Sequence, residues 1–502
     1  MASPLVAARR RLTRATEASR SPRVRLQLGL VAVLAAVAIA LAVATHPATT
    51  LLVAIVIGII VLARRSPALA LGAAVLLFEF EGSTKVLLTL EGTPLPGSDR
   101  EVGAAAIDVA LLAAVAGVLL QDRFRTPRAL WSSASSWERI ALGVIAAWLA
   151  LSVLQITQSG DIGQGARGFR LFQWYTLVAL ATLTLFARPE RRAAATRGAL
   201  AIGLVVSAYA ALRVAIGPAD AEREFALSIR TVTLVGETVR AIGSFSSAVG
   251  LASFTAPVAV FGVVVGLLLP RLRVPAWTLA GLALVGLIDS YSRAALYGVA
   301  LGLACGLFLV FAASGIPGRR KLAATGILLA TVVGSYGGFL AASQTVPELR
   351  ERAEGVLNPW GDESVELRFE TWDREFDDAL DHPLGQGLGV VGGASAPIGD
   401  GRRTTDNSFL KVLVEQGVLG LVLFVTGIVT VILLLARRLI RIAPDSRPVA
   451  FAALAGFVSF LGISFSGEYV EQPGKVVAWS LLGIAAAYAF FDSAPSPDRE
   501  RA

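Results

Sequence analysis

Two adjoining segments organise this sequence: residues 382–393 read HPLGQGLGVVGG, and residues 404–424 read TTDNSFLKVLVEQGVLGLVLF. The first lies within the longest polar stretch of an otherwise apolar chain. The second leads from that stretch into a hydrophobic run long enough to cross a bilayer, which takes about 20 apolar residues in a helix. We therefore expect the rest of the chain to be a membrane scaffold around this polar region.

Composition indicates an integral membrane protein. Of its 502 residues, 55% are hydrophobic and 16% are charged, and apolar runs recur from end to end. This pattern predicts an all-α polytopic membrane protein with about 12–14 transmembrane helices. The single cysteine, Cys305, excludes an intramolecular disulfide. The two histidines, His46 and His382, are not accompanied by a carboxylate cluster, so we expect neither a metal site nor a cofactor.

The apolar runs divide the chain into a bundle, a loop and a second group of helices. The predicted spans are residues 26–45, 49–63, 68–80, 102–120, 140–156, 171–187, 198–216, 248–269, 274–288, 294–313, 322–341, 408–436, 449–465 and 475–491. The chain is thus expected to comprise a basic tail (1–25), a helix bundle (26–341), a large loop (342–406), C-terminal membrane helices (407–491) and a second tail (492–502).

Charge predicts the orientation of these spans. Arginines gather in alternate loops and in the first 25 residues, which contain seven of them. This positive-inside pattern predicts a multi-pass membrane protein with both termini in the cytoplasm, and it explains the net charge of +8 without a nucleic-acid partner. Residues 342–405 contain thirteen acidic residues and six arginines. The large loop is therefore expected to face the extracytoplasmic side.

An amphipathic helix is predicted inside the large loop. Val365, Phe369, Trp372, Phe376 and Leu380 recur at helical spacing with charged residues between them, and His382-Pro383 ends the pattern. We expect this helix to pack as a lid on the outer mouth of the bundle. A helix lying in the membrane interface is the alternative, but such helices favour a basic polar face and this one is acidic.

Arginines outside the basic loops are the sharpest functional signal, because a guanidinium near the apolar core usually faces a cavity or a partner. A planar guanidinium matches phosphate oxygens in pairs, so several around one cavity would hold a pyrophosphate. Snorkelling to the interface, or pairing with a nearby acid such as Asp289 beside Arg293, is the competing explanation. The candidates are Arg167, Arg170, Arg213, Arg240, Arg293 and, on the predicted lid, Arg368.

Other polar groups near the lid are weaker candidates. The glycines Gly385, Gly387 and Gly389 would let backbone amides approach a phosphate or a sugar, or would simply form a flexible turn.

Asp406 and Asn407 stand where the loop enters a membrane helix. Asp406 would either cap this helix or act as a general base towards a sugar hydroxyl. His382 is a less favoured base, because it precedes proline in a bend. Lys411 and Glu415 would pair with each other or extend a polar lining.

Three further acids and a tyrosine are harder to place from sequence. Asp108, isolated within a span, is expected to face the bundle interior. Glu468, Tyr469 and Glu471 fall in the short loop SGEYVEQPGK and are expected to be exposed.

Several of these motifs together resemble the O-antigen ligase and polymerase family. They are Ser292-Arg293-Ala294, the R-x-x-G-S-F segment at 240–245, the HPLGQGLG loop, and N-x-x-L-x-x-x-x-x-x-G-x-L-G at 407–420. The glycines Gly385, Gly387 and Gly389 and residues Asn407, Leu410, Glu415, Gly417 and Gly420 match the family pattern. The resemblance covers residues 240–424 best. The chain departs from the pattern at Asp406, where the family has a histidine.

The resemblance implies a GT-C-like, metal-independent glycosyltransferase whose donor is an undecaprenyl-diphosphate-linked oligosaccharide and whose acceptor is a glycan or a lipid. It further implies that Arg240 and Arg293 hold the diphosphate and that Asp406 stands at the position of the proposed base. It favours polysaccharide polymerisation or ligation at the outer face of the cytoplasmic membrane, as in O-antigen or exopolysaccharide biosynthesis. A transporter or flippase of a lipid-linked or anionic substrate, and a catalytically silent glycan-lipid binder, are the alternatives.

Overall fold

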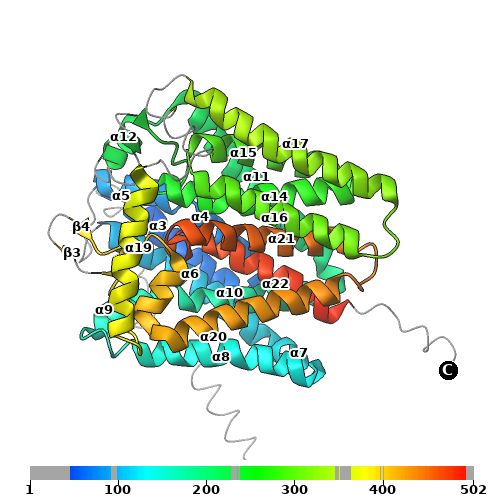
Figure 1. The fold of residues 1–502 in the computed structure, drawn as a ribbon, viewed down its shortest axis with the longest axis horizontal. Helices are drawn as coiled ribbons and strands as arrows, with labels where there is room; N and C mark the ends of the chain where they lie inside the picture. Colours follow the sequence, from blue (N-terminus) through cyan, green and yellow to red (C-terminus); the bar gives the residue numbers. More distant parts are fainter. Residues whose placement is uncertain are drawn as a thin grey trace, which may run out of the picture.

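The fold is described by a computed structural model, which covers residues 46–91, 99–227, 234–235, 238–344, 350, 363–395, 397–398 and 401–492. The predicted span at 26–45 and the tails at 1–25 and 493–502 lie outside the described residues. Nearly every described segment is helical (Figure 1). The prediction of an all-α polytopic membrane protein is confirmed.

The first half of the chain forms a series of long helices joined by short ones. They are α3 (Pro47–Arg65), α4 (Pro67–Glu79), α5 (Glu81–Glu91), α6 (Asp99–Asp122), α7 (Arg125–Ser133), α8 (Ser136–Gln155), α9 (Ile162–Leu171), the 3-10 turn η1 (Gln173–Tyr175), α10 (Thr176–Phe186), α11 (Pro189–Ile216) and α12 (Asp220–Leu227).

The second half contains the central helices and the lid. Its helices are α14 (Ala248–Leu268), α15 (Arg273–Asp289), α16 (Arg293–Ala312), α17 (Gly318–Ser343), α19 (Glu363–Asp381), α20 (Ser408–Leu439), α21 (Arg447–Ile463) and α22 (Lys475–Phe491). Between them lie the 3-10 turns η2 (Pro270–Leu272), η4 (Gly392–Ala394), η5 (Ser464–Ser466) and η6 (Tyr469–Glu471). Two antiparallel hairpins, β1 (Leu234–Val235) with β2 (Thr238–Val239) and β3 (Pro397–Ile398) with β4 (Gly401–Arg402), are the strands of the described region.

The described region contains eleven segments that are long and apolar enough to cross a membrane, with α9 and α10 counted as one segment. The apolar helices α4 and α22 are shorter. With these two shorter helices, the described region contains thirteen apolar helical segments, which lies within the predicted range of 12–14. The core is centred on α14, which packs against α15, α16 and α21, and 89% of its most apolar window is buried.

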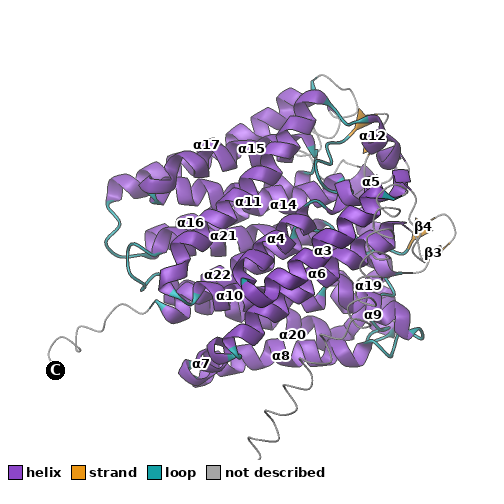
Figure 2. Cartoon of the chain, turned by 180° about the vertical axis from the view of Figure 1, so that it is seen from behind, coloured by secondary structure: helices purple, strands orange, loops and turns teal. Residues whose placement is uncertain are grey.

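The two ends of the bundle differ in chemistry. At one end, ion pairs join segments far apart in the sequence: Arg192 Nη1 lies 2.6 Å from Asp492 Oδ1, and Arg438 Nε lies 2.6 Å from Glu138 Oε1. We call this the arginine-rich end. Figures 1 and 2 show α5, α9, α12 and α19 gathered at the opposite end, which we call the lid end. The basic loops and the loop that contains α19 therefore lie at opposite ends of the bundle.

Helix α20 bends sharply near its start. Gly417 has φ 68° and ψ −173°, values outside the helical region, although the helix continues on both sides. The bend leaves room for the turn that follows α19, whose Pro383 carbonyl accepts a hydrogen bond of 3.1 Å from the amide of Val418. A β-carbon on Gly417 would stand 2.2 Å from that carbonyl oxygen, which explains why a glycine is needed there.

The predicted amphipathic helix is present as α19, and Val365, Phe369 and Trp372, three of its five apolar positions, line a cavity beneath it. Glu375 and Ala379 are buried, whereas Phe376 and Leu380 are about half exposed. Ala379 packs against Leu410, Leu413 and Val414 of α20, and Arg403 pairs with Glu375 on the same face. Phe376 and Leu380 therefore lie outside the buried face of α19.

Candidate functional site

A small cavity of about 140 Å³ lies under α19 at the lid end of the bundle. Two guanidinium groups reach it, one from the first residue of α16 and one from α19. Arg368 Nη1 donates a hydrogen bond of 3.1 Å to Ser466 Oγ, which fixes its direction. The cavity is lined by Arg293, Ala294, Tyr297, Val365, Arg368, Phe369, Trp372 and Ser466. We call it the arginine pocket.

The N-terminus of α16 adds to the positive character of the arginine pocket. Arg293 is the first helical residue, and the unpaired amides of a helix start attract anions. The sequence suggested that Arg293 pairs with Asp289 one helical turn earlier. In the structure α15 ends at Asp289 and a new helix begins at Arg293, so the two residues do not share a helix and that spacing argument is wrong.

Arg240 approaches the same region from the segment before α14. Its side chain is buried, and its Nε donates a hydrogen bond of 2.8 Å to the Ser290 carbonyl. The amide of Ala241 donates to the Asp289 carbonyl at 3.1 Å. These two bonds tie the R-x-x-G-S-F segment to the α15–α16 turn, only a few residues from Arg293.

Tyr469 stands between these arginines. Its hydroxyl shares a hydrogen bond of 2.9 Å with Ser292 Oγ, and it is 3% exposed. Burial raises the pKa of Tyr469, while the Ser292 hydroxyl and the charges of Arg240 and Arg368 act in the opposite direction. The phenol is therefore neutral near pH 7 and is available as a hydrogen-bonding group. The expectation that this residue is exposed is wrong.

The remaining predicted arginines lie apart from the pocket. Arg170 Nη1 pairs with Asp108 Oδ2 at 2.7 Å, and the Tyr175 hydroxyl donates to the other oxygen at 2.6 Å. Asp108 therefore faces inward as predicted, but it neutralises Arg170. Arg213 pairs with Glu222, and Arg167 is exposed on α9. Of the predicted arginines, Arg293 and Arg368 line the pocket, and Arg240 is held beside it by its hydrogen bond to Ser290.

Asp406 and Asn407 have separate roles at the start of α20. Asn407 Oδ1 accepts hydrogen bonds from the amides of Phe409 at 2.8 Å and Leu410 at 3.2 Å, so Asn407 is the cap of this helix. The prediction that Asp406 provides the cap is wrong. Asp406 is exposed and has φ 46°, and its charge contributes to the raised pKa of Tyr469. Within the described residues its carboxylate accepts no hydrogen bond, so it is free to bind a substrate hydroxyl.

Lys411 is a buried structural cation. Its Nζ donates to the Val391 carbonyl at 2.7 Å and lies 2.7 Å from Glu415 Oε1 and 3.0 Å from Glu471 Oε1. At 1% exposure it cannot reach a substrate, so the predicted polar lining at Lys411 is replaced by an ion-pair cluster. Glu471, which was expected to be exposed, is an integral part of that cluster.

Glu468 lies beside the same cluster and was also expected to be exposed. Its Oε1 accepts hydrogen bonds from the Thr405 amide at 2.8 Å and the Thr405 hydroxyl at 3.0 Å. Burial, followed by repulsion from Glu471, raises the pKa of Glu468 to about 7. The Glu468 carboxyl is therefore hydrogen-bonded to Thr405, the residue before Asp406.

The glycine run packs against protein backbone. Gly385, Gly387 and Gly389 have φ between 80° and 97°, in the left-handed region that favours glycine. Their amides donate to the His382 carbonyl, the Glu415 carbonyl and Glu415 Oε1, at 2.8, 3.0 and 2.7 Å. These amides are already paired, so the geometry gives the glycines a role in holding the lid and not in cradling a phosphate.

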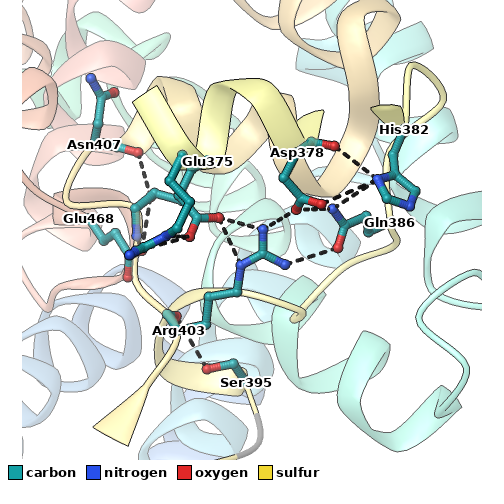
Figure 3. A network of polar contacts seen from close by, with 10 residues as sticks. Glu375, Asp378, His382, Gln386, Ser395, Arg403, Asn407 and Glu468 are labelled. Carbon is teal, nitrogen blue, oxygen red and sulfur yellow. Dashed lines mark hydrogen bonds and ion pairs between the residues drawn. The ribbon is translucent and has the colours of Figure 1, made fainter. Parts of the chain in front are cut away.

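A polar network fastens the C-terminal end of α19 (Figure 3). Arg403 pairs with Glu375 and Asp378 and donates to Gln386 Oε1 at 3.0 Å. Burial raises the pKa of Asp378, but hydrogen bonds from Gln386 and Arg403 outweigh burial and leave the pKa below its ordinary value. His382 Nδ1 lies 2.9 Å from the Asp378 carbonyl oxygen, so this imidazole is part of the network that holds the end of α19 in place.

The described part of the chain contains no group of three or more histidine, cysteine or acidic side chains placed to hold a metal ion. Residues 278–425 match the family model described as O-antigen ligase. The matched segment runs from α15 to the first half of α20 and includes Arg293, Arg368 and Asp406. No curated protein matches the chain.

Proposed function

We propose that the protein transfers a glycan from a polyprenyl-diphosphate donor, such as undecaprenyl diphosphate, to a glycan or lipid acceptor. The proposal starts from the match of residues 278–425 to the family model described as O-antigen ligase. The family match supports glycan ligation or polymerisation in general. We assign the donor, the acceptor and the site residues from the arginine pocket and the residues around it.

The convergence of Arg240, Arg293 and Arg368 supports this proposal. During transfer, the bond between the sugar C1 and the diphosphate oxygen breaks, and the leaving diphosphate gains negative charge. Guanidinium groups held by protein contacts stabilise that charge without reorganising, and their planar shape matches phosphate oxygens. We therefore assign these three arginines to the diphosphate and propose a mechanism that needs no metal ion.

Asp406 is the candidate general base. Asp406 is exposed at the start of α20. Its negative charge raises the pKa of Tyr469, a residue on which the charges of Arg240 and Arg368 also act. In the proposed step, the acceptor hydroxyl gives its proton to the Asp406 carboxylate while its oxygen forms the new bond to C1. The Tyr469 phenol would hydrogen-bond an oxygen of the donor or the acceptor.

The proposed reaction takes place at the outer face of the bacterial cytoplasmic membrane. The arginine pocket and Asp406 lie at the lid end, and the basic loops lie at the other end, which the positive-inside rule assigns to the cytoplasm. A lipid-linked donor in the outer leaflet could then present its diphosphate to the pocket while its tail stays in the bilayer.

The test is transfer by purified, full-length protein in vesicles that contain an undecaprenyl-diphosphate oligosaccharide from the host. Wild type should form glycosidic products, whereas Arg293→Ala and Asp406→Asn should lose about 100-fold or more in rate. Arg441→Gln and Asp445→Asn are matched controls, because both residues are exposed at the arginine-rich end. These controls should retain the wild-type rate.

The size of the products distinguishes two forms of the reaction. A ladder of increasing glycan length identifies a polymerase, and a single transfer that requires a second acceptor identifies a ligase. If wild type forms no glycosidic product with any acceptor, the proposal of an enzyme is refuted and transport or binding of a lipid-linked glycan takes its place.

A further inference from the structure

A second cavity, of about 670 Å³, lies between the helices on the side of α4 and has no part in the proposed transfer. Its walls come from α4, α10, α11, α14 and α22, which contact one another in the bundle (Figure 2). The lining is almost entirely apolar, with Leu71, Leu76, Ile202, Phe261 and Ile484 among its side chains. We call this cavity the α4 groove.

The α4 groove has a charged mouth at one end only. Arg65 is the last residue of α3, and Arg191 lies in the first turn of α11, so both stand at the arginine-rich end. Their neighbours Arg188 and Arg192 are neutralised by Asp122 and Asp492.

Within the described residues, the side chains of Arg65 and Arg191 form neither a hydrogen bond nor an ion pair. The groove therefore combines an apolar interior with two cations that are unpaired in the part of the chain that the structure describes.

The depth of the α4 groove fits one leaflet of a bilayer. Along α11 the lining runs from Arg191 to Gly203, which is roughly 18 Å at the helical rise of about 1.5 Å per residue. Half of the hydrocarbon core is roughly 15 Å. An acyl chain that starts at the arginines would reach the middle of the membrane within the groove.

We propose that the α4 groove binds an anionic phospholipid of the leaflet at the arginine-rich end, with its phosphate on Arg65 and Arg191 and an acyl chain along α4. Basic pockets between transmembrane helices on the cytoplasmic side recognise such headgroups. The glycan donor is assigned to the opposite end of the bundle, where the arginine pocket lies. The proposed phospholipid is therefore distinct from the glycan donor. Its binding does not depend on whether the protein transfers glycans.

The test measures lipid retention by native mass spectrometry of the delipidated full-length protein in detergent. Dioleoyl phosphatidylglycerol and dioleoyl phosphatidylcholine are compared, because they share acyl chains and differ in net charge. Wild type should retain phosphatidylglycerol preferentially. Arg65→Gln and Arg191→Gln should each weaken this retention about fivefold, whereas the neighbouring Arg64→Gln, which does not line the groove, should leave it unchanged.

A second pair of variants tests the apolar part of the groove. A β-carbon on Gly198 would meet nothing within 4 Å, and one on Gly72 would meet only Ile202 Cδ1 at 3.8 Å, so leucine at these positions fills the cavity without disturbing the backbone. The double variant Gly72→Leu/Gly198→Leu should lose phosphatidylglycerol. Gly143→Leu on α8 is the control, because its added side chain also meets open space but lies outside the groove.

Three results would overturn the proposal. They are equal retention of both phospholipids by wild type, undiminished retention in the double leucine variant, and binding of undecaprenyl diphosphate in place of phosphatidylglycerol with the same sensitivity to the two arginines. The last result would identify the groove as a site for the polyprenyl lipid.

Discussion

Single residues at the lid end show a division between charges buried in ion pairs and charges that line a cavity or lie at the surface. Lys411, Glu415 and Glu471 satisfy one another in a buried cluster. Asp406 is exposed, and the guanidinium groups of Arg293 and Arg368 line a cavity. The proposed chemistry uses the second group, and its geometry depends on the first.

Replacing Lys411 by methionine should destabilise the protein strongly. The substitution leaves the carboxylates of Glu415 and Glu471 buried without a cation, and loss of one partner of a buried ion pair typically costs about 3–5 kcal/mol. The free energy of unfolding, measured by titration with SDS in mixed micelles, gives the loss. Arg374→Met is the control, because the Arg374 side chain is 69% exposed, and it should change stability by less than about 1 kcal/mol. Equal losses in both variants would contradict a buried cluster.

Glu468 should make stability depend on pH. Its pKa is raised to about 7 from 4.5, so between these values the folded protein holds a proton that the unfolded chain has released. Stability should therefore fall as pH rises through this window, by up to roughly 1.4 kcal/mol per pH unit, and level off above it. Glu468→Gln should remove this slope, and Glu366→Gln, on the exposed face of α19, should keep it. Parallel curves for wild type and Glu468→Gln would show that this carboxyl is not the source.

The sequence predicted part of this arrangement. Arginines outside the basic loops are costly in a membrane protein, and the candidates selected by this rule include Arg293 and Arg368, which line one cavity, and Arg240, which is hydrogen-bonded to the turn before Arg293. The same rule also selected Arg170 and Arg213, because sequence does not reveal that Asp108 and Glu222 lie beside them. Tyr469 and Glu468 were expected to be exposed because their loop is short, but the loop folds inward onto Ser292 and Thr405.

Among the elements, the bend in α20 and the turn after α19 depend on each other. The amides of Gln386 and Gly387 donate to the carbonyls of Val414 and Glu415, which lie just before the bend at Gly417. The lid is thus attached to the membrane bundle through main-chain hydrogen bonds, in addition to the contacts of Arg403.

Gly417→Ala should loosen this attachment. The residue has a left-handed φ of 68°, and an added β-carbon would stand 2.2 Å from the Pro383 carbonyl oxygen. A non-glycine residue in such a conformation costs roughly 1–3 kcal/mol, before the overlap is counted. Limited proteolysis should cut residues 363–407 faster than in wild type. Gly337→Ala on α17, where a β-carbon meets open space, should be cut at the wild-type rate, and a similar rate in Gly417→Ala would contradict the predicted strain.

Hydrophobic runs were sufficient to predict the described membrane helices, but they did not reveal the bend or the orientation of the lid. The apolar run from Ser408 to Ala436 contains three glycines, and nothing in its composition distinguishes Gly417 from Gly420 or Gly427. Helical spacing predicted α19, but the partners of its buried face are distant in sequence: Ala379 packs against Leu410 and Val414, and Glu375 pairs with Arg403, 28 residues away.

For the molecule as a whole, charge separates the two ends of the bundle and predicts its orientation. In a Cys305→Ala background, Glu366→Cys on α19 should react with a membrane-impermeant maleimide in intact cells. Arg441→Cys at the arginine-rich end should react only after the membrane is permeabilised. Both positions are exposed, so accessibility within the protein is matched. The reverse labelling pattern would place the arginine pocket in the cytoplasm and contradict a reaction at the outer face.

The length of α4 also affects the lipid around the protein. Its 13 residues span roughly 20 Å, about 10 Å less than the hydrocarbon core of a typical bilayer. Leu69 is 65% exposed, so this helix meets lipid directly. A bilayer that borders so short an apolar surface thins at a cost of a fraction of a kcal/mol per Å. The protein should therefore concentrate in thin or short-chain regions of a membrane, and its lateral distribution would be set by elasticity as well as by its substrates.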